Sequence, residues 1–261
     1  MTEQSPQDEM RDQPTQRREP RDAAYWARYA ETLKVTGVAE GATNINVEGR
    51  RAVGPLQGFG KMWQKTYRVR LTGAEVTPAE VIRAWKDNYK DFWPEGNRFY
   101  APLSGIAPGE VALISGSLPG GVTLSTGVMV LYADDESFTL MTPQGHPFSG
   151  WITFSSFEED GAKVAQAQVL MRASDPIYEV GLTLGGHGQE DRFWEHTLGS
   201  LAAHFEHEAE VDTQVVCVDR KRQWSKWRNV WHSAAIRSTL YTLGAPGRLL
   251  KGLFRRDRPV G

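Results

Sequence analysis

Short apolar segments separated by turn residues fill the middle of the chain. Between residues 98 and 174, apolar or alternating stretches are interrupted by clusters such as Pro119-Gly120-Gly121 and Pro143-Gln144-Gly145. This pattern predicts strands near residues 98–103, 110–116, 122–132, 137–142, 148–158 and 163–173, after an earlier strand at about 66–71. The spacing leaves no room for crossover helices, so we expect an antiparallel meander.

Apolar residues recur at helical spacing on both sides of this meander. Thr77-Pro78-Ala79-Glu80 combines an N-cap threonine, a proline at the first helical position and a glutamate that can reach back to the cap, so a helix is predicted to begin there. A longer helix is predicted from about Gln189 to Glu208. Near the N-terminus, a helix beginning at Asp22 is predicted from an aromatic face formed by Tyr25, Trp26, Tyr29 and Leu33.

Together these elements predict an α+β fold in which a curved antiparallel sheet wraps around the long C-terminal helix, with helical extensions at both ends. Such a fold leaves a cavity between the sheet and the helix. We divide the chain into a disordered tail at 1–21, a helix and irregular connection at 22–59, the main domain at 60–208 and a basic, aromatic extension at 209–261.

Composition and targeting signals narrow the setting. The chain has 261 residues, of which 40% are apolar, so it can bury a sizeable core. Its one cysteine, Cys217, excludes an intramolecular disulfide and fits a reducing compartment. Neither an apolar run of about 20 residues nor a hydrophobic leader is present, so we expect a cytoplasmic protein.

Charge is unevenly distributed along the chain. The formal net charge is -2, but residues 220–258 carry eleven Lys or Arg and one acidic residue, Asp257. Such a segment predicts an anionic partner. Within it, Trp224, Trp227 and Trp231 follow one another at i, i+3 and i+7 among basic residues, a spacing compatible with core packing, nucleic-acid binding or membrane binding.

The end of this segment predicts a short amphipathic helix that lies on an anionic membrane, so peripheral membrane association is the expected role of the tail. Its predicted membrane-binding residues are Arg248, Leu249, Leu250, Lys251, Leu253, Phe254 and Arg255. We rank nucleic acid below membrane because the body of the chain is acidic and no nucleic-acid motif occurs. A third reading is that residues 224–243 pack on the domain and the rest is a solubilising tail.

Three phrases of the sequence resemble a known family. They are Thr77-Pro78-Ala79-Glu80 to Trp93-Pro94, Gly145-His146-Pro147 to Phe154, and Arg172-Ala173-Ser174-Asp175-Pro176. In this order they resemble the START-like superfamily, also called SRPBCC or helix-grip, and in particular an uncharacterised bacterial branch with a Gly-His-Pro turn. The resemblance covers about residues 60–208. It implies a hydrophobic ligand cavity but no particular chemistry, since the superfamily includes lipid carriers, hormone receptors, cyclases and ring-hydroxylase subunits.

Methionine and aromatic residues of the meander are the candidate walls of that cavity, because adaptable side chains suit an irregular apolar ligand. The alternative for each of them is plain core packing. The candidates are Met129, Met141, Trp151, Phe154 and Met171.

Two polar residues join these candidates. His146 lies in a turn where it could lean over the cavity mouth and act as a general base near neutral pH. Arg172 could anchor a ligand carboxylate, although a structural ion pair with Asp175 is favoured.

Several chemistries can be set aside. The histidines His196, His204 and His207 have neither HExxH spacing nor a Cys pair beside them, and helical geometry turns His196 and His207 away from the apolar stripe. The Ser115 to Gly121 loop lacks the lysine of a phosphate-binding loop, and neither a nucleophile elbow nor a dinucleotide fingerprint occurs. We therefore expect no metal and no cofactor.

Two functions follow, with a third behind them. The first is a non-enzymatic carrier that holds a hydrophobic small molecule or lipid in the cavity and approaches a membrane through its tail. The alternative is a cyclase- or dehydratase-like enzyme for a polyketide-like or aromatic substrate, in which His146, Arg172 or Tyr132 transfers protons or stabilises charge. An interaction protein that merely presents its tail would instead have its cavity filled by its own side chains.

Overall fold

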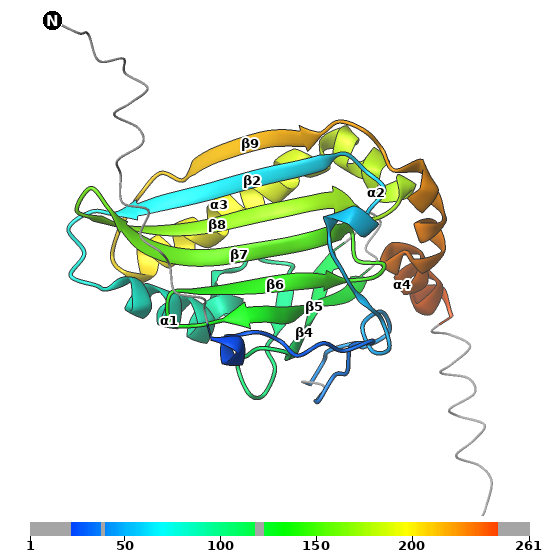
Figure 1. Ribbon diagram of the computed structural model, residues 1–261, viewed down its shortest axis with the longest axis horizontal. Helices are drawn as coiled ribbons and strands as arrows, with labels where there is room; N and C mark the ends of the chain where they lie inside the picture. Colours follow the sequence, from blue (N-terminus) through cyan, green and yellow to red (C-terminus); the bar gives the residue numbers. More distant parts are fainter. Residues whose placement is uncertain (1–21, 38–39, 118–122, 245–261) are drawn as a thin grey trace, which may run out of the picture.

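The computed structural model describes residues 22–37, 40–117 and 123–244, and a single large antiparallel sheet dominates it (Figure 1). The strands follow the order β3-β4-β5-β6-β7-β8-β2-β9, and β1 pairs with β6. Their bounds are Ala52–Val53 (β1), Met62–Leu71 (β2), Arg98–Tyr100 (β3), Val111–Ser117 (β4), Thr123–Ala133 (β5), Ser137–Pro143 (β6), Phe148–Glu159 (β7), Ala162–Ala173 (β8) and Asp212–Asp219 (β9). The predicted meander is confirmed as β3 to β8.

Two strands of this sheet were not predicted, the two-residue β1 and the longer β9. β9 pairs antiparallel with β2 and continues the sheet beyond residue 208, where the predicted main domain ends. It is an edge strand that is largely exposed, so it lacks the regular alternation of apolar and polar residues that marks a half-buried strand.

Two helical segments cover the inner face of the sheet. They are formed by α1 (Pro78–Asn88) with the 3₁₀ turn η4 (Tyr89–Phe92), and by the long helix α3 (His187–His204). In Figure 1 both lie behind the sheet. The capping prediction for α1 is confirmed, since the Glu80 N–H donates to the Thr77 hydroxyl over 3.2 Å and the Thr77 N–H donates to Glu80 Oε2 over 2.7 Å. The α+β fold with a long helix against an open antiparallel sheet is the helix-grip arrangement that the sequence predicts.

The approach to α3 is kinked. α2 (Pro176–Gly181) runs through η5 (Leu182–Gly186) into α3, and Gly185 interrupts the helical path with a φ of 117°. A conformation of this kind is readily available only to glycine. The kink allows α3 to leave α2 at the end of β8 and turn back across the inner face.

The predicted N-terminal helix is wrong. Only a 3₁₀ turn, η2 (Ala23–Tyr25), forms, and the chain then runs extended. The Ala27 N–H donates to the Leu131 carbonyl over 2.8 Å, and Trp26 forms an isolated antiparallel bridge with Tyr132 of β5. Backbone groups that a helix would pair internally are therefore paired with a strand, and the aromatic side chains contact Tyr132 instead of forming one helical face.

The described part of the C-terminal extension folds onto the domain. The short 3₁₀ segment η6 (Trp224–His232) and the helix α4 (Ala234–Leu243) follow β9, and α4 packs against β5. The Ala234 N–H donates to the Gly145 carbonyl over 2.8 Å. Gly145 has a φ of 93°, and a methyl group added there would lie 2.1 Å from the His232 carbonyl oxygen. The Gly-His-Pro turn is therefore a docking point for the extension.

We predict that Gly145→Ala destabilises the fold more than the same change at another glycine with a positive φ. Gly161 is the control, because its φ is 74° but nothing lies within 4 Å of an added methyl group. Urea unfolding should show a loss of about 1 kcal/mol for Gly161→Ala, and roughly 2 kcal/mol more for Gly145→Ala. Equal losses would show that the turn does not pack closely on His232.

Candidate functional site

The strand register places the predicted ligand residues on opposite faces of the sheet. Met171 pairs with Gly150, two residues from Ile152 and four from Phe154, and these positions share the inner face. Met129 pairs with Met141, which pairs with Trp151, so these three share the outer face. Phe154 and Met171 are therefore separated by the sheet from the other three, and the five do not form one cavity wall.

Aromatic side chains fill the space between the sheet and the helices. Trp85 of α1 contacts Phe154 with ring centroids 4.9 Å apart, and Tyr89 lies 5.8 Å from Phe138 and 5.4 Å from Phe154. Trp85, Phe138 and Phe154 are completely buried, so no water-sized space touches them. This packing differs from the ligand cavity expected there, because the aromatic residues of α1 and η4 occupy the volume.

The outer-face candidates lie under the N-terminal part of the chain. Met129 belongs to a small buried cluster with Leu33 and Val47. A methyl group placed on Gly54 would lie 3.3 Å from the Trp151 ring, so the segment around Gly54 covers that indole. These residues pack the connection onto the sheet.

His146 has a local role in its turn. Its Nδ1 lies 3.0 Å from the Phe148 backbone nitrogen and 3.1 Å from the Phe148 carbonyl oxygen, so the ring bonds to the backbone of its own turn. Burial lowers the pKa of His146 to about 4, so the imidazole is neutral near pH 7. It stabilises the turn that docks the C-terminal extension.

The Arg172 side chain is buried and holds neighbouring strands together. The prediction that it pairs with Asp175 is wrong. Arg172 Nη2 lies 2.5 Å from Asp219 Oδ2, and its Nη1 donates to the Gly60 and Lys221 carbonyls over 2.6 and 2.9 Å. Asp175 instead caps α2, accepting hydrogen bonds from two backbone N–H groups. The Arg172 guanidinium has several donors, so it can bond to the ends of both β2 and β9. The Asp175 carboxylate is instead drawn to the free N–H groups at the start of α2.

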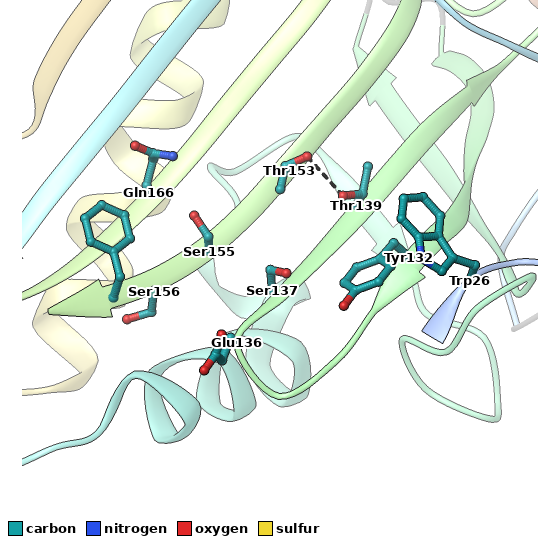
Figure 2. Close-up of a pocket in the computed structure, with 10 residues that line it drawn as sticks. Trp26, Tyr132, Glu136, Ser137, Thr139, Thr153, Ser155, Ser156 and Gln166 are labelled. Carbon is teal, nitrogen blue, oxygen red and sulfur yellow. Dashed lines mark hydrogen bonds between the residues drawn. The ribbon is translucent and has the colours of Figure 1, made fainter. Parts of the chain in front are cut away.

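A hollow of about 710 Å³ lies on the outer face of the sheet (Figure 2). We call it the outer groove. Its lining comes from the N-terminal segment and from β5 to β8, and consists of Trp26, Tyr132, Glu136, Ser137, Thr139, Thr153, Ser155, Ser156, Phe157 and Gln166.

The outer groove combines aromatic walls with neutral hydrogen-bonding groups. Trp26 and Tyr132 meet edge to face with centroids 4.8 Å apart, and they lie at one end of the labelled residues in Figure 2. The Thr139 and Thr153 hydroxyls lie 3.0 Å apart on neighbouring strands. Of the ten lining side chains, Glu136 alone is an acid and none is basic. The arrangement suits an uncharged ligand with a flat apolar face and several oxygen atoms.

A signal for this groove is present in the sequence. In β6 and β7, Phe138, Leu140, Ile152 and Phe154 point inward, and the intervening residues are small and hydroxylated. Reading that alternation as two separate faces would have identified the Ser/Thr positions. The contribution of Trp26 could not be foreseen, because it depends on the N-terminal segment being extended.

A buried ionic cluster lies between β2 and the start of α3. The Lys65 ammonium, fully buried, is 2.7 Å from Asp191 Oδ1 and 2.9 Å from Glu190 Oε2, and the Tyr67 hydroxyl donates to Asp191 over 2.7 Å. Burial raises the pKa of Glu190 to about 7, although Lys65 acts in the opposite direction. The cluster fastens the helix just after its kink. Sequence reasoning missed it because Lys65 looked like the end of a basic loop.

The three histidines do not form a metal site. His196 is exposed, the His204 ring packs against Phe92 with centroids 5.7 Å apart, and His207 bonds to the Thr72 carbonyl. Within residues 22–37, 40–117 and 123–244, no group of three His, Cys, Asp or Glu could hold a metal ion.

We predict that Glu190 makes stability fall as pH rises. Its pKa of about 7 in the folded protein exceeds the ordinary 4.5, so between these values the folded state binds more protons than the unfolded chain. From pH 5.5 to 8 the wild type should lose on the order of 2 kcal/mol relative to Glu190→Gln.

Urea unfolding of both proteins at the two pH values measures this difference. His146 titrates in the opposite sense, since its pKa is lowered, but it is present in both proteins and cancels. Identical pH profiles for the two proteins would contradict the assignment.

Comparisons with known proteins give distant backbone likenesses. No protein-family model matches the chain. No curated protein matches it. Among solved structures, protein Ms6760 from Mycobacterium smegmatis is 14% identical with a TM-score of 0.40, over 55% of this chain and 90% of that one. The di-domain ARO/CYC StfQ from the steffimycin biosynthetic pathway is 10% identical with a TM-score of 0.43, over 56% and 51%. Ara h 8.0201 is 12% identical with a TM-score of 0.38, over 54% and 99%. Likeness this distant carries no argument about function, and START-like family membership stays a prediction.

Proposed function

We propose that this protein binds an uncharged, ring-containing small molecule with several hydroxyl or carbonyl groups, in the outer groove. The observation that carries the proposal is the combination of an aromatic wall at Trp26 and Tyr132 with the paired hydroxyls of Thr139 and Thr153. Aromatic faces accept the flat apolar side of such a ligand, and hydroxyls both donate and accept hydrogen bonds.

Size and charge support a small neutral ligand. A volume of about 710 Å³ lies within the range of roughly 300 to 1,000 Å³ that is usual for small-molecule sites. The single carboxylate, Glu136, stands among neutral side chains, and an anionic ligand would have no cation in the lining to pair with. A purely aliphatic ligand would cover the hydroxyls of the groove without offering them a hydrogen bond.

This proposal keeps the binding role expected from the sequence and changes its location and ligand. The predicted carrier holds a hydrophobic molecule inside the helix grip, where Trp85, Phe138 and Phe154 now occupy the space. Opening that interior would expose several large aromatic side chains, each worth about 1.5 to 3 kcal/mol of burial. The outer groove accepts a ligand without such a cost.

The enzymatic alternative has one observation in its favour. Tyr132 lines the groove, and its hydroxyl bonds to the Asp134 carboxylate. A phenol held by a carboxylate could transfer a proton to a bound carbonyl compound, as a cyclase or dehydratase requires. His146 and Arg172, the other two proposed groups, have structural partners elsewhere. Turnover lost in Tyr132→Phe, with binding retained, would support the enzyme.

We expect the flat polyphenol quercetin, used as a probe, to bind more tightly than flavone, its parent compound without hydroxyl groups. Thr153→Val should raise the Kd for quercetin roughly three- to tenfold, the worth of one hydrogen bond, and Trp26→Ala should raise it at least as much. Isothermal titration calorimetry measures each Kd.

Thr66→Val is the matched control, since Thr66 lies on the same outer face in β2 and bonds to Gln168 without lining the groove. Its Kd should equal that of the wild type. Failure of quercetin to bind, or unchanged binding in both groove variants, would count against the proposal.

A further inference from the structure

The η6 segment exposes three tryptophan side chains to solvent. Trp224 is 68% exposed, Trp227 is 49% exposed and Trp231 is 70% exposed. In the edge strand β9, which precedes η6 in the chain, Val216 is 45% exposed and Val218 is 53% exposed. Several large apolar side chains exposed along one stretch of chain, residues 216–231, are typical of an interaction site.

The segment that carries these tryptophans is firmly held. The Gln223 N–H donates to the Phe59 carbonyl over 2.7 Å, and the Asn229 side chain donates to the Gln57 and Ser174 carbonyls, each over 2.8 Å. At its far end Ser233 and Ala234 are buried. The polar and small residues of η6 thus anchor it to the body, and its largest apolar residues are left facing solvent.

Positive charge surrounds the tryptophans. Residues 220–244 contain six Lys or Arg and no Asp or Glu. Arg222 pairs with Glu179 over 2.8 Å, whereas the described residues place no carboxylate within ion-pair distance of Arg220, Lys226 or Arg228. Because no acidic residue of the described part of the chain pairs with these cations, they are available to an anionic partner.

We propose that Trp224, Trp227 and Trp231, together with Arg220, Lys226 and Arg228, form a surface that docks this protein on a membrane containing anionic lipid. We call it the tryptophan surface. Tryptophan side chains prefer the level of the lipid headgroups, and each basic residue near an anionic leaflet contributes about 1 kcal/mol. No helix among the described residues is long enough and apolar enough to cross a bilayer.

Two observations favour lipid over nucleic acid. The exposed aliphatic side chains of β9, Val216 and Val218, can enter a lipid interface but offer no face on which a base can stack. The chain also leaves α4 at the same end of the molecule as η6 (Figure 1), and the predicted membrane-binding residues 248–255, which lie outside the described residues, follow in sequence.

The test is co-sedimentation of the full chain with phosphatidylcholine vesicles, with and without about one-third phosphatidylglycerol. We expect binding to the anionic vesicles only, weakened by salt. The double variant Trp227→Ala/Trp231→Ala should bind at least tenfold more weakly, and Arg228→Gln roughly fivefold more weakly.

The matched control is Tyr29→Ala/Leu103→Ala, which removes two side chains that are each 93% exposed elsewhere on the protein. It should bind as the wild type does. Quercetin binding in the outer groove should be unchanged in the tryptophan variant, which also confirms that the variant folds.

Three outcomes would overturn the proposal. The first is no vesicle binding together with tight binding of a single-stranded oligonucleotide, measured by fluorescence anisotropy. The second is equal loss in the tryptophan variant and the control. The third is binding that survives Trp227→Ala/Trp231→Ala but is abolished by Leu250→Ser/Phe254→Ser, which would assign membrane attachment to the tail alone.

Discussion

The packing of aromatic side chains against the inner face of the sheet is the constraint on which the rest of the structure depends. Trp85 and Tyr89 from one helical layer meet Phe138 and Phe154 from the sheet, and Leu198 of α3 is buried in the same core. Protein interiors are close-packed, so a volume filled in this way is closed to a ligand unless the helices move. The part of the interior around Trp85, Phe138 and Phe154 is therefore occupied by the protein's own side chains.

The outer face is organised by the same alternation that builds the core. In β6 and β7, inward Phe138 and Phe154 alternate with outward serines and threonines (Ser137, Thr139, Thr153 and Ser155), so the filled core and the hydroxyl-lined part of the outer face are two consequences of one pattern. The N-terminal segment then adds an aromatic wall beside β5. The lining residues of the groove on β7 run from Thr153 to Phe157, whereas η6 is bonded through Asn229 to Ser174, which directly follows Ala173, the partner of Phe148 at the other end of β7. A protein docked through the tryptophan surface would thus keep the groove clear of the membrane.

How much of this follows from the sequence depends on whether a residue's partners are local. The capping box of α1 and the strands β3 to β8 were predictable because turn residues and periodicity are encoded within a few positions. The extended path of residues 26–33, the pairing of β9 with β2 and the Arg172–Asp219 pair were not, since each depends on residues tens to more than a hundred positions away. Lys65 shows the same limit: its alternation with Tyr67 places it inside, but only Glu190 and Asp191 explain how a buried ammonium is tolerated.

The most direct test of the central claim is a measurement of which residues a bound ligand contacts. In a quercetin titration followed by methyl NMR, our account predicts shifts of the Thr139 and Thr153 methyl signals on the outer face, while those of Met171 and Leu198 inside the helix grip stay unchanged. Shifts of the Met171 and Leu198 methyls, with Thr139 and Thr153 unaffected, would contradict it and return the ligand to the interior.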